Sequence, residues 1–81
     1  MSITVTISKA ASDRDIDQVQ LLVRHLQDFD LNFKGRAIRI QRGFITSVVD
    51  TDDLLRGALL KLMVDSLLTR PDQRARVASD V

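Results

Sequence analysis

The chain contains no cysteine and no glutamate, and it has one proline in 81 residues. Without cysteine, neither a disulfide nor a thiolate metal site can support the fold. Because glutamate is absent, any carboxylate chemistry must use the shorter side chain of aspartate. A chain of this length hides only about 60–65% of its unfolded surface. We therefore expect a modest stability that depends on the hydrophobic core.

The sequence also lacks an apolar run near the roughly 20 residues that cross a bilayer. Its N-terminus has no basic region followed by an apolar one. The net charge of +1 gives no strong general attraction to nucleic acid or acidic lipid. We expect a soluble, cytoplasmic protein with a single α/β domain over residues 1–70, followed by a polar, flexible tail over residues 71–81.

The first half of the chain predicts a strand and a helix. Residues 2–8 alternate between apolar and polar side chains, which is typical of a half-buried strand. Ser12 is a suitable N-cap for a helix that reaches Phe29. The apolar stripe that we expect to face the core comprises Ile16, Val19, Leu22, Val23, Leu26 and Phe29. Phe33 is expected to fold back on the core edge, and Gly35 lets the chain turn.

Residues 36–49 alternate on both sides of Arg42-Gly43, which predicts a β-hairpin with a two-residue loop. The side chains on its core face are Ile38, Ile40, Ile45 and Val49. A second helix follows, capped by Asp50 or Thr51 and ending before Pro71. The sequence therefore predicts an α/β two-layer fold in the order β-α-β-β-α, with a three-stranded sheet and two helices on one face.

The second helix is apolar on two sides, whereas an ordinary surface helix has one apolar stripe. We expect Leu55, Ala58, Leu59 and Leu62 to cover the sheet. The other side, a strip of Leu60, Val64 and Leu67 with Arg56 nearby, is then exposed, and monomers seldom leave such a strip in water. Self-association as a twofold dimer, or docking of a partner protein, would cover it. Burial of this strip against the first helix remains an open alternative.

Aspartates gather at the starts of both predicted helices, where caps and the helix dipole favour them. Asp13, Asp15 and Asp17 resemble the opening of a calcium loop, but Gln18 and Arg24 occupy the positions that need glycine and a bidentate carboxylate. Magnesium binding by Asp50, Asp52 and Asp53 is a weaker alternative to capping.

Catalytic constellations are missing from the sequence. The single histidine, His25, has Leu21 and Phe29 one helical turn away, and neither can orient an imidazole. There is no glycine-rich phosphate loop and no recognisable nucleophile elbow. We expect neither an enzyme nor a bound cofactor or metal.

Basic residues on the predicted hairpin give an alternative function. Arg36, Arg39 and Arg42 lie on or beside it, and Arg39 shares its open face with Phe44. A sheet face that carries arginine and an aromatic side chain can stack bases. The alternative is therefore a nucleic-acid-binding module that uses these four residues.

The pattern Met1-x-Ile3-x-Val5-Thr6-Ile7-x-Lys9, then a helix, then Ile38-Arg39-Ile40 and Ile45-Thr46-Ser47-Val48-Val49, resembles the DinI family. These small proteins of β-α-β-β-α order regulate the RecA recombinase in the DNA-damage response. The resemblance implies the same fold and a RecA-like partner.

The family's final helix carries an acidic ridge, whereas this chain has Asp52, Asp53 and Asp65 interrupted by Arg56 and Lys61. The resemblance therefore supports the scaffold more than the partner. Our leading hypothesis is a small, non-catalytic regulatory module, of a kind common on mobile elements, that binds a partner protein through its second helix.

Overall fold

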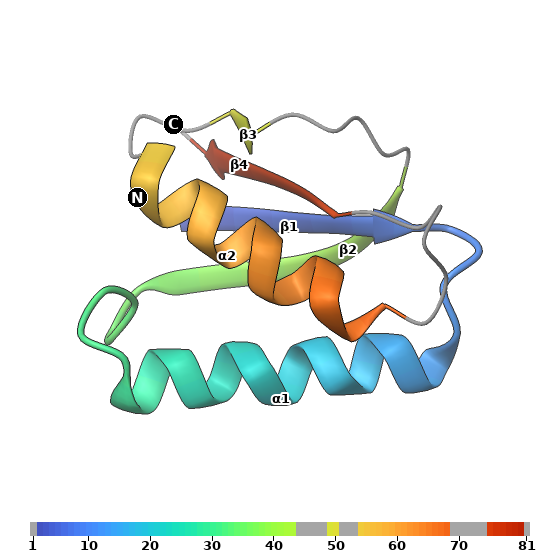
Figure 1. The fold of residues 1–81 in the computed structure, drawn as a ribbon, viewed down its shortest axis with the longest axis horizontal. Helices are drawn as coiled ribbons and strands as arrows, with labels where there is room; N and C mark the ends of the chain where they lie inside the picture. The colour runs from blue at the N-terminus through green and yellow to red at the C-terminus, as the bar shows by residue number, and fades with distance from the viewer. Residues whose placement is uncertain (1, 44–48, 51–53, 69–74, 81) are drawn as a thin grey trace.

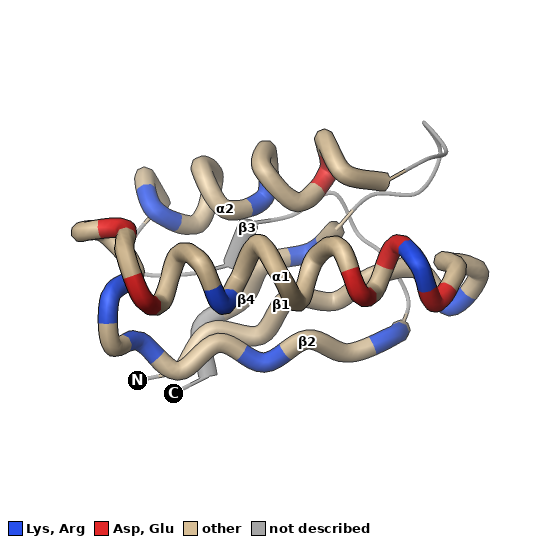
Figure 2. The backbone as a smooth tube through the Cα atoms, turned by 90° about the horizontal axis from the view of Figure 1, so that it is seen from below, with Lys and Arg blue, Asp and Glu red and all other residues tan. Residues whose placement is uncertain are grey.

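The computed structural model describes residues 2–43, 49–50, 54–68 and 75–80 (Figure 1). Its elements are β1 (Ser2–Ser8), α1 (Asp13–Phe29), β2 (Ala37–Gly43), β3 (Val49–Asp50), α2 (Leu54–Leu67) and β4 (Arg76–Asp80). Figures 1 and 2 show both helices on one side of the sheet. The predicted two-layer α/β class is confirmed, and the first five elements follow the predicted order β-α-β-β-α. Neither described helix is long and apolar enough to cross a membrane.

A fourth strand joins the three that the sequence predicts. The sheet has the order β2-β1-β4-β3. β2 runs parallel to β1, β4 runs antiparallel to β1, and β3 runs parallel to β4. β4 comes from residues that we predicted as part of a polar tail. It forms because Val77, opposite Val5 in the register, is fully buried and contributes to the core.

The predicted hairpin is wrong in its pairing. β2 continues through Arg42 and Gly43, and Gly43 pairs with Ser8 instead of turning the chain. A Cβ atom at Gly43 would lie 3.0 Å from Cγ2 of Thr6, so the missing side chain permits a close approach between β2 and β1. β3 pairs with β4, and β2 pairs with β1, among the described strands. Residues 44–48, which include Phe44, lie outside the described part of the chain.

The core is built on β1, the strand that carries the most buried side chains. Val5 and Ile7 are fully buried on the helix side, and Thr4 and Thr6 are nearly so on the other side. The same cluster includes apolar residues from both helices and from β4. Its buried members are Ile3, Val5, Ile7, Ala11, Val19, Val23, Leu26, Phe33, Leu60, Val64, Ala75 and Val77.

Helix α1 begins and packs largely as the sequence predicts. The Ser12 hydroxyl accepts a hydrogen bond from the backbone N–H of Asp15 at 3.1 Å, which confirms the N-cap. Phe29, which we expected on the core stripe, is 71% exposed, whereas Phe33 is fully buried. The turn at Gly35, with φ of 74°, returns the chain toward β2 after Phe33 has entered the core.

Helix α2 has the opposite orientation to the one we predicted. Leu60 and Val64 are fully buried, and Leu67 packs partly buried against the core. Leu55 and Leu62, which we expected to cover the sheet, are exposed. Gly57 lies one turn before Leu60 on the buried side. The apolar side of α2 that carries the small Gly57 therefore faces the core.

One aspartate connects the end of α2 to the start of β4. Asp65 Oδ1 accepts a hydrogen bond from the backbone N–H of Ala75 at 2.7 Å. Asp65 Oδ2 pairs with Lys61 Nζ at 2.6 Å, and both side chains are largely shielded from solvent. Ala75 is fully buried, and Asp65 is the acceptor that its N–H has among the described residues. Asp65 therefore fixes where β4 enters the sheet.

The orientation of α2 is tested by a pair of leucine substitutions. Leu60→Ala should lower the free energy of unfolding by about 2–5 kcal/mol, because it opens a cavity in the core. Leu62→Ala, at a position that is 68% exposed, should change it by less than about 0.5 kcal/mol in the monomer. Urea unfolding followed by circular dichroism measures both values. Equal losses in the two variants would contradict the observed orientation.

The role of Asp65 is tested by removing its acceptor atoms. Asp65→Ala should destabilise the fold by about 1–3 kcal/mol, because the buried N–H of Ala75 loses its partner. Asp65→Asn retains one carbonyl oxygen as an acceptor and should lose less than Asp65→Ala. Thermal and urea unfolding of the three proteins provide the comparison, and Asp28→Ala, at an exposed position on α1, serves as the control.

Candidate functional site

The predicted interface strip on α2 is not a surface. Leu60 and Val64 are fully buried in the monomer, while Leu67 and Arg56 are partly buried. The sequence correctly indicates that α2 has two apolar sides, but it assigns the wrong one to solvent. The strip is part of the core because the sheet has a fourth strand for α2 to cover.

The exposed apolar side of α2 comprises Leu55, Ala58, Leu59 and Leu62, which we call the outer face. Leu55 is 81% exposed, Leu62 is 68% exposed and Leu59 is 39% exposed. Leu54 adjoins this face at the start of the helix and is 65% exposed. These residues recur at the spacing of one helical side, so they form a continuous apolar strip along α2. Such a strip typically marks a contact surface.

The outer face carries no charged side chain. The charged residues of α2 are Arg56, Lys61 and Asp65. Lys61 and Asp65 pair with each other, and Arg56 is partly buried. A charged ligand would therefore find no counter-charge on the outer face, whereas another apolar surface could pack against it.

A second surface lies at the opposite edge of the sheet, along β2. Arg36 precedes this strand, and Arg39 and Arg42 lie within it, so the predicted basic residues do gather along one edge (Figure 2). Arg39 is opposite Thr4 in the register, on the side of the sheet away from the helices. Arg42 is bound to α1, because its Nη2 pairs with Asp13 Oδ1 at 2.7 Å. Phe44 lies outside the described residues.

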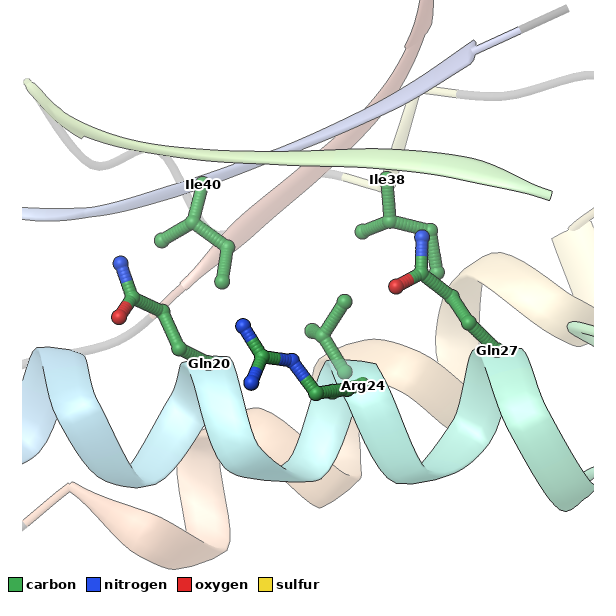
Figure 3. Close-up of a pocket in the computed structure, with 6 residues that line it drawn as sticks. Gln20, Arg24, Gln27, Ile38 and Ile40 are labelled. Carbon is green, nitrogen blue, oxygen red and sulfur yellow. The ribbon is translucent and has the colours of Figure 1, made fainter.

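A groove of about 310 Å³ lies between β2 and α1. Figure 3 shows Ile38 and Ile40 projecting from β2 toward α1, and Gln20, Arg24 and Gln27 projecting from α1 toward the strand. The groove thus has an apolar floor and a polar rim on the helix side. Arg24 is exposed and makes no hydrogen bond or ion pair with the described residues.

Polar contacts join α1 and β2 on both sides of the groove along the strand. On one side, Gln27 Nε2 donates a hydrogen bond to the carbonyl oxygen of Arg36 at 2.8 Å. On the other side, Arg42 Nη2 reaches both Asp13 Oδ1 and the carbonyl oxygen of Ala11, at 2.7 and 3.3 Å. These contacts hold α1 along β2.

The described residues show no group of three or more metal-binding side chains. The His25 ring lies 5.1 Å from the ring of Phe29 and pairs with no carboxylate of the described residues. The hydroxyls of Ser12 and Ser66 bond to backbone groups close in sequence. Asp15 is buried at the start of α1, whereas Asp13 pairs with Arg42. Asp52 and Asp53 lie outside the described residues.

The sequence did not predict the outer face of α2 or the groove beside β2. The outer face of α2 carries Leu55, Leu59 and Leu62 at helical spacing, and Gly57 on the other side was the signal that could have oriented the helix. The groove depends on β2 pairing with β1 at the edge of the sheet, which the apolar pattern of β2 does not specify.

Comparison of the chain with protein-family models, with curated proteins and with solved structures gives no match.

Proposed function

We propose that the protein is a small, non-catalytic protein-binding module whose contact surface is the outer face of α2. The observation that carries this proposal is the exposure of Leu55, Leu59 and Leu62 on a helix whose opposite side packs into the core. Burying a leucine side chain yields about 1.5–3 kcal/mol relative to leaving it in water. A partner that covers three or four leucines therefore gains a substantial part of its binding free energy from this face.

A second copy of the chain is the first partner that we propose. The apolar positions of the outer face are symmetric about the bond between Ala58 and Leu59, with Leu55 and Leu62 equally distant from it. In an antiparallel pairing about a twofold axis, Leu55 would therefore meet Leu62 of the partner subunit. The small side chain of Ala58 lets the two helices approach closely, and no charge on this face opposes the contact.

The local chemistry of the described residues supports a binding role. The Ser12 hydroxyl caps α1, the Thr6 hydroxyl accepts a hydrogen bond from Gln41 Nε2, and the His25 ring lies tilted against the ring of Phe29. Nucleophilic or acid–base catalysis needs a group positioned against a second titratable partner. The structure instead offers exposed apolar surface on α2, and burying this surface would contribute binding free energy.

A RecA-like partner rests on the DinI resemblance alone. The acidic ridge that the family carries on its final helix has no counterpart on α2, whose single acidic residue, Asp65, is paired with Lys61. We therefore propose a second copy of the chain, and not RecA, as the first partner. A pull-down with RecA filaments tests binding to the recombinase separately.

Self-association is tested by adding a charge to the outer face. The unaltered chain should form a concentration-dependent dimer, and Leu62→Asp should be a folded monomer, because burying an unpaired carboxylate is costly. Sedimentation equilibrium or light scattering over a range of concentrations gives the molar mass, and circular dichroism checks the fold.

Leu21→Asp is the matched control, because Leu21 is an exposed leucine on α1 (61% exposed) outside the outer face. It should dimerise as the unaltered chain does. An unaltered chain that stays monomeric at the highest concentration it tolerates would contradict the second-copy proposal.

A further inference from the structure

We propose that the β2 edge and the groove beside it form a second binding site, which accepts an extended acidic peptide segment as an added strand. The site uses residues of β2 and α1, and it is separate from the outer face of α2. It gives this protein a partner of defined chemistry: a chain in β conformation that places an aspartate or glutamate side chain in the groove.

The first support for this site is the sheet edge itself. β2 is the last strand on its side of the described sheet and pairs on one side only, with β1. Its seven residues span about 23 Å, and every second residue turns its N–H and C=O away from β1. An added strand satisfies these groups through backbone hydrogen bonds, which is how strand addition obtains affinity without a particular sequence.

The groove supplies the selectivity that backbone pairing lacks. Alternate side chains of an added strand point toward α1, over Ile38 and Ile40. Apolar side chains would pack on these isoleucines, and a carboxylate between them would reach the Arg24 guanidinium. Arginine binds carboxylates through two parallel hydrogen bonds, and Arg24 has no such partner among the described residues.

Charge disfavours a second copy of β2 in this site. Antiparallel pairing of two β2 strands would bring Arg36, Arg39 and Arg42 of one copy close to the same residues of the other. Like charges on adjacent strands are destabilising. Arg36 beside the strand and Arg24 in the groove instead favour an acidic strand, so the charge pattern both disfavours self-pairing of the edge and selects its ligand.

The lining of the groove favours a peptide over nucleic acid. Its floor is aliphatic, with Val23, Ile38 and Ile40, and the described residues that line it include no aromatic ring on which a base could stack. Arg42, the basic residue at the end of the strand, is already paired with Asp13. One arginine over an aliphatic floor suits a single carboxylate better than a chain of phosphates.

The proposal is tested by selecting peptides from a random phage-displayed library against the full-length chain. We expect enriched sequences that alternate apolar and polar residues and carry aspartate or glutamate. The best synthetic peptide should bind Arg24→Glu at least about tenfold more weakly than the unaltered chain, because a charged hydrogen-bonded pair is replaced by like charges. Fluorescence anisotropy gives the Kd values, and circular dichroism confirms that each variant folds.

Two variants and one altered peptide make the test specific. Arg14→Glu introduces the same charge change at an exposed position of α1 that does not line the groove, and it should bind as the unaltered chain does. Leu62→Asp should also bind normally, which separates this site from the outer face of α2. A peptide N-methylated at alternate residues should lose binding, since it cannot form the backbone hydrogen bonds. In hydrogen exchange, alternate β2 amides should gain protection when the peptide is bound.

Several results would overturn the proposal. These are the absence of enrichment over the starting library, equal binding by Arg24→Glu and Arg14→Glu, or undiminished binding of the N-methylated peptide. Displacement of the peptide by single-stranded oligothymidine at low salt would assign the edge to nucleic acid instead. A monomeric chain that still binds the peptide would leave this inference intact while contradicting the second-copy proposal for α2.

Discussion

The antiparallel pairing of β4 with β1 determines where the other elements lie. Because β4 occupies one side of β1, only the opposite side remains for β2, which becomes the edge of the sheet. β3 then pairs with β4, and α2 packs against these two strands. Val77 opposite Val5, both fully buried, lies at the centre of this arrangement. The exposed β2 edge and the orientation of α2 are both consequences of this one contact.

The same pairing explains why several leucines of α2 stay exposed. A helix that covers two strands and one neighbouring helix can bury one side, and α2 buries Gly57, Leu60 and Val64 there. Leu55 and Leu62 on the other side have no core to enter. The monomer therefore lacks the stabilisation that their burial would give, which is about 1.5–3 kcal/mol for each leucine. An apolar contact made through the outer face recovers that free energy.

Periodicity was sufficient to predict the parts of the fold that depend on local sequence. The strict alternation of β1, the Ser12 cap and the core stripe of α1 without Phe29 each follow from residues close in the chain. Pairing partners depend on residues far apart, and the turn chemistry at Arg42-Gly43 suggested a hairpin, whereas Gly43 instead makes room for Thr6. On its own, the segment Arg76-Val77-Ala78 is too short and polar to predict a strand. It becomes a strand because Val77 lies opposite Val5 in the sheet. Since α2 is apolar on nearly every side, its orientation follows from that pairing and not from its own pattern.

The two candidate surfaces lie on opposite flanks of the molecule, with α2 toward the β3–β4 side and the groove beside β2 and α1 (Figure 2). A twofold pair joined through the outer faces of α2 would therefore leave both β2 edges accessible. Such a dimer would present two strand-accepting edges, and a partner with two acidic segments would bind it more tightly than it binds one chain, because the second contact is intramolecular. The apolar face and the basic edge thus differ in chemistry as well as position: one gains free energy from burial, and the other from backbone hydrogen bonds and a single charge pair.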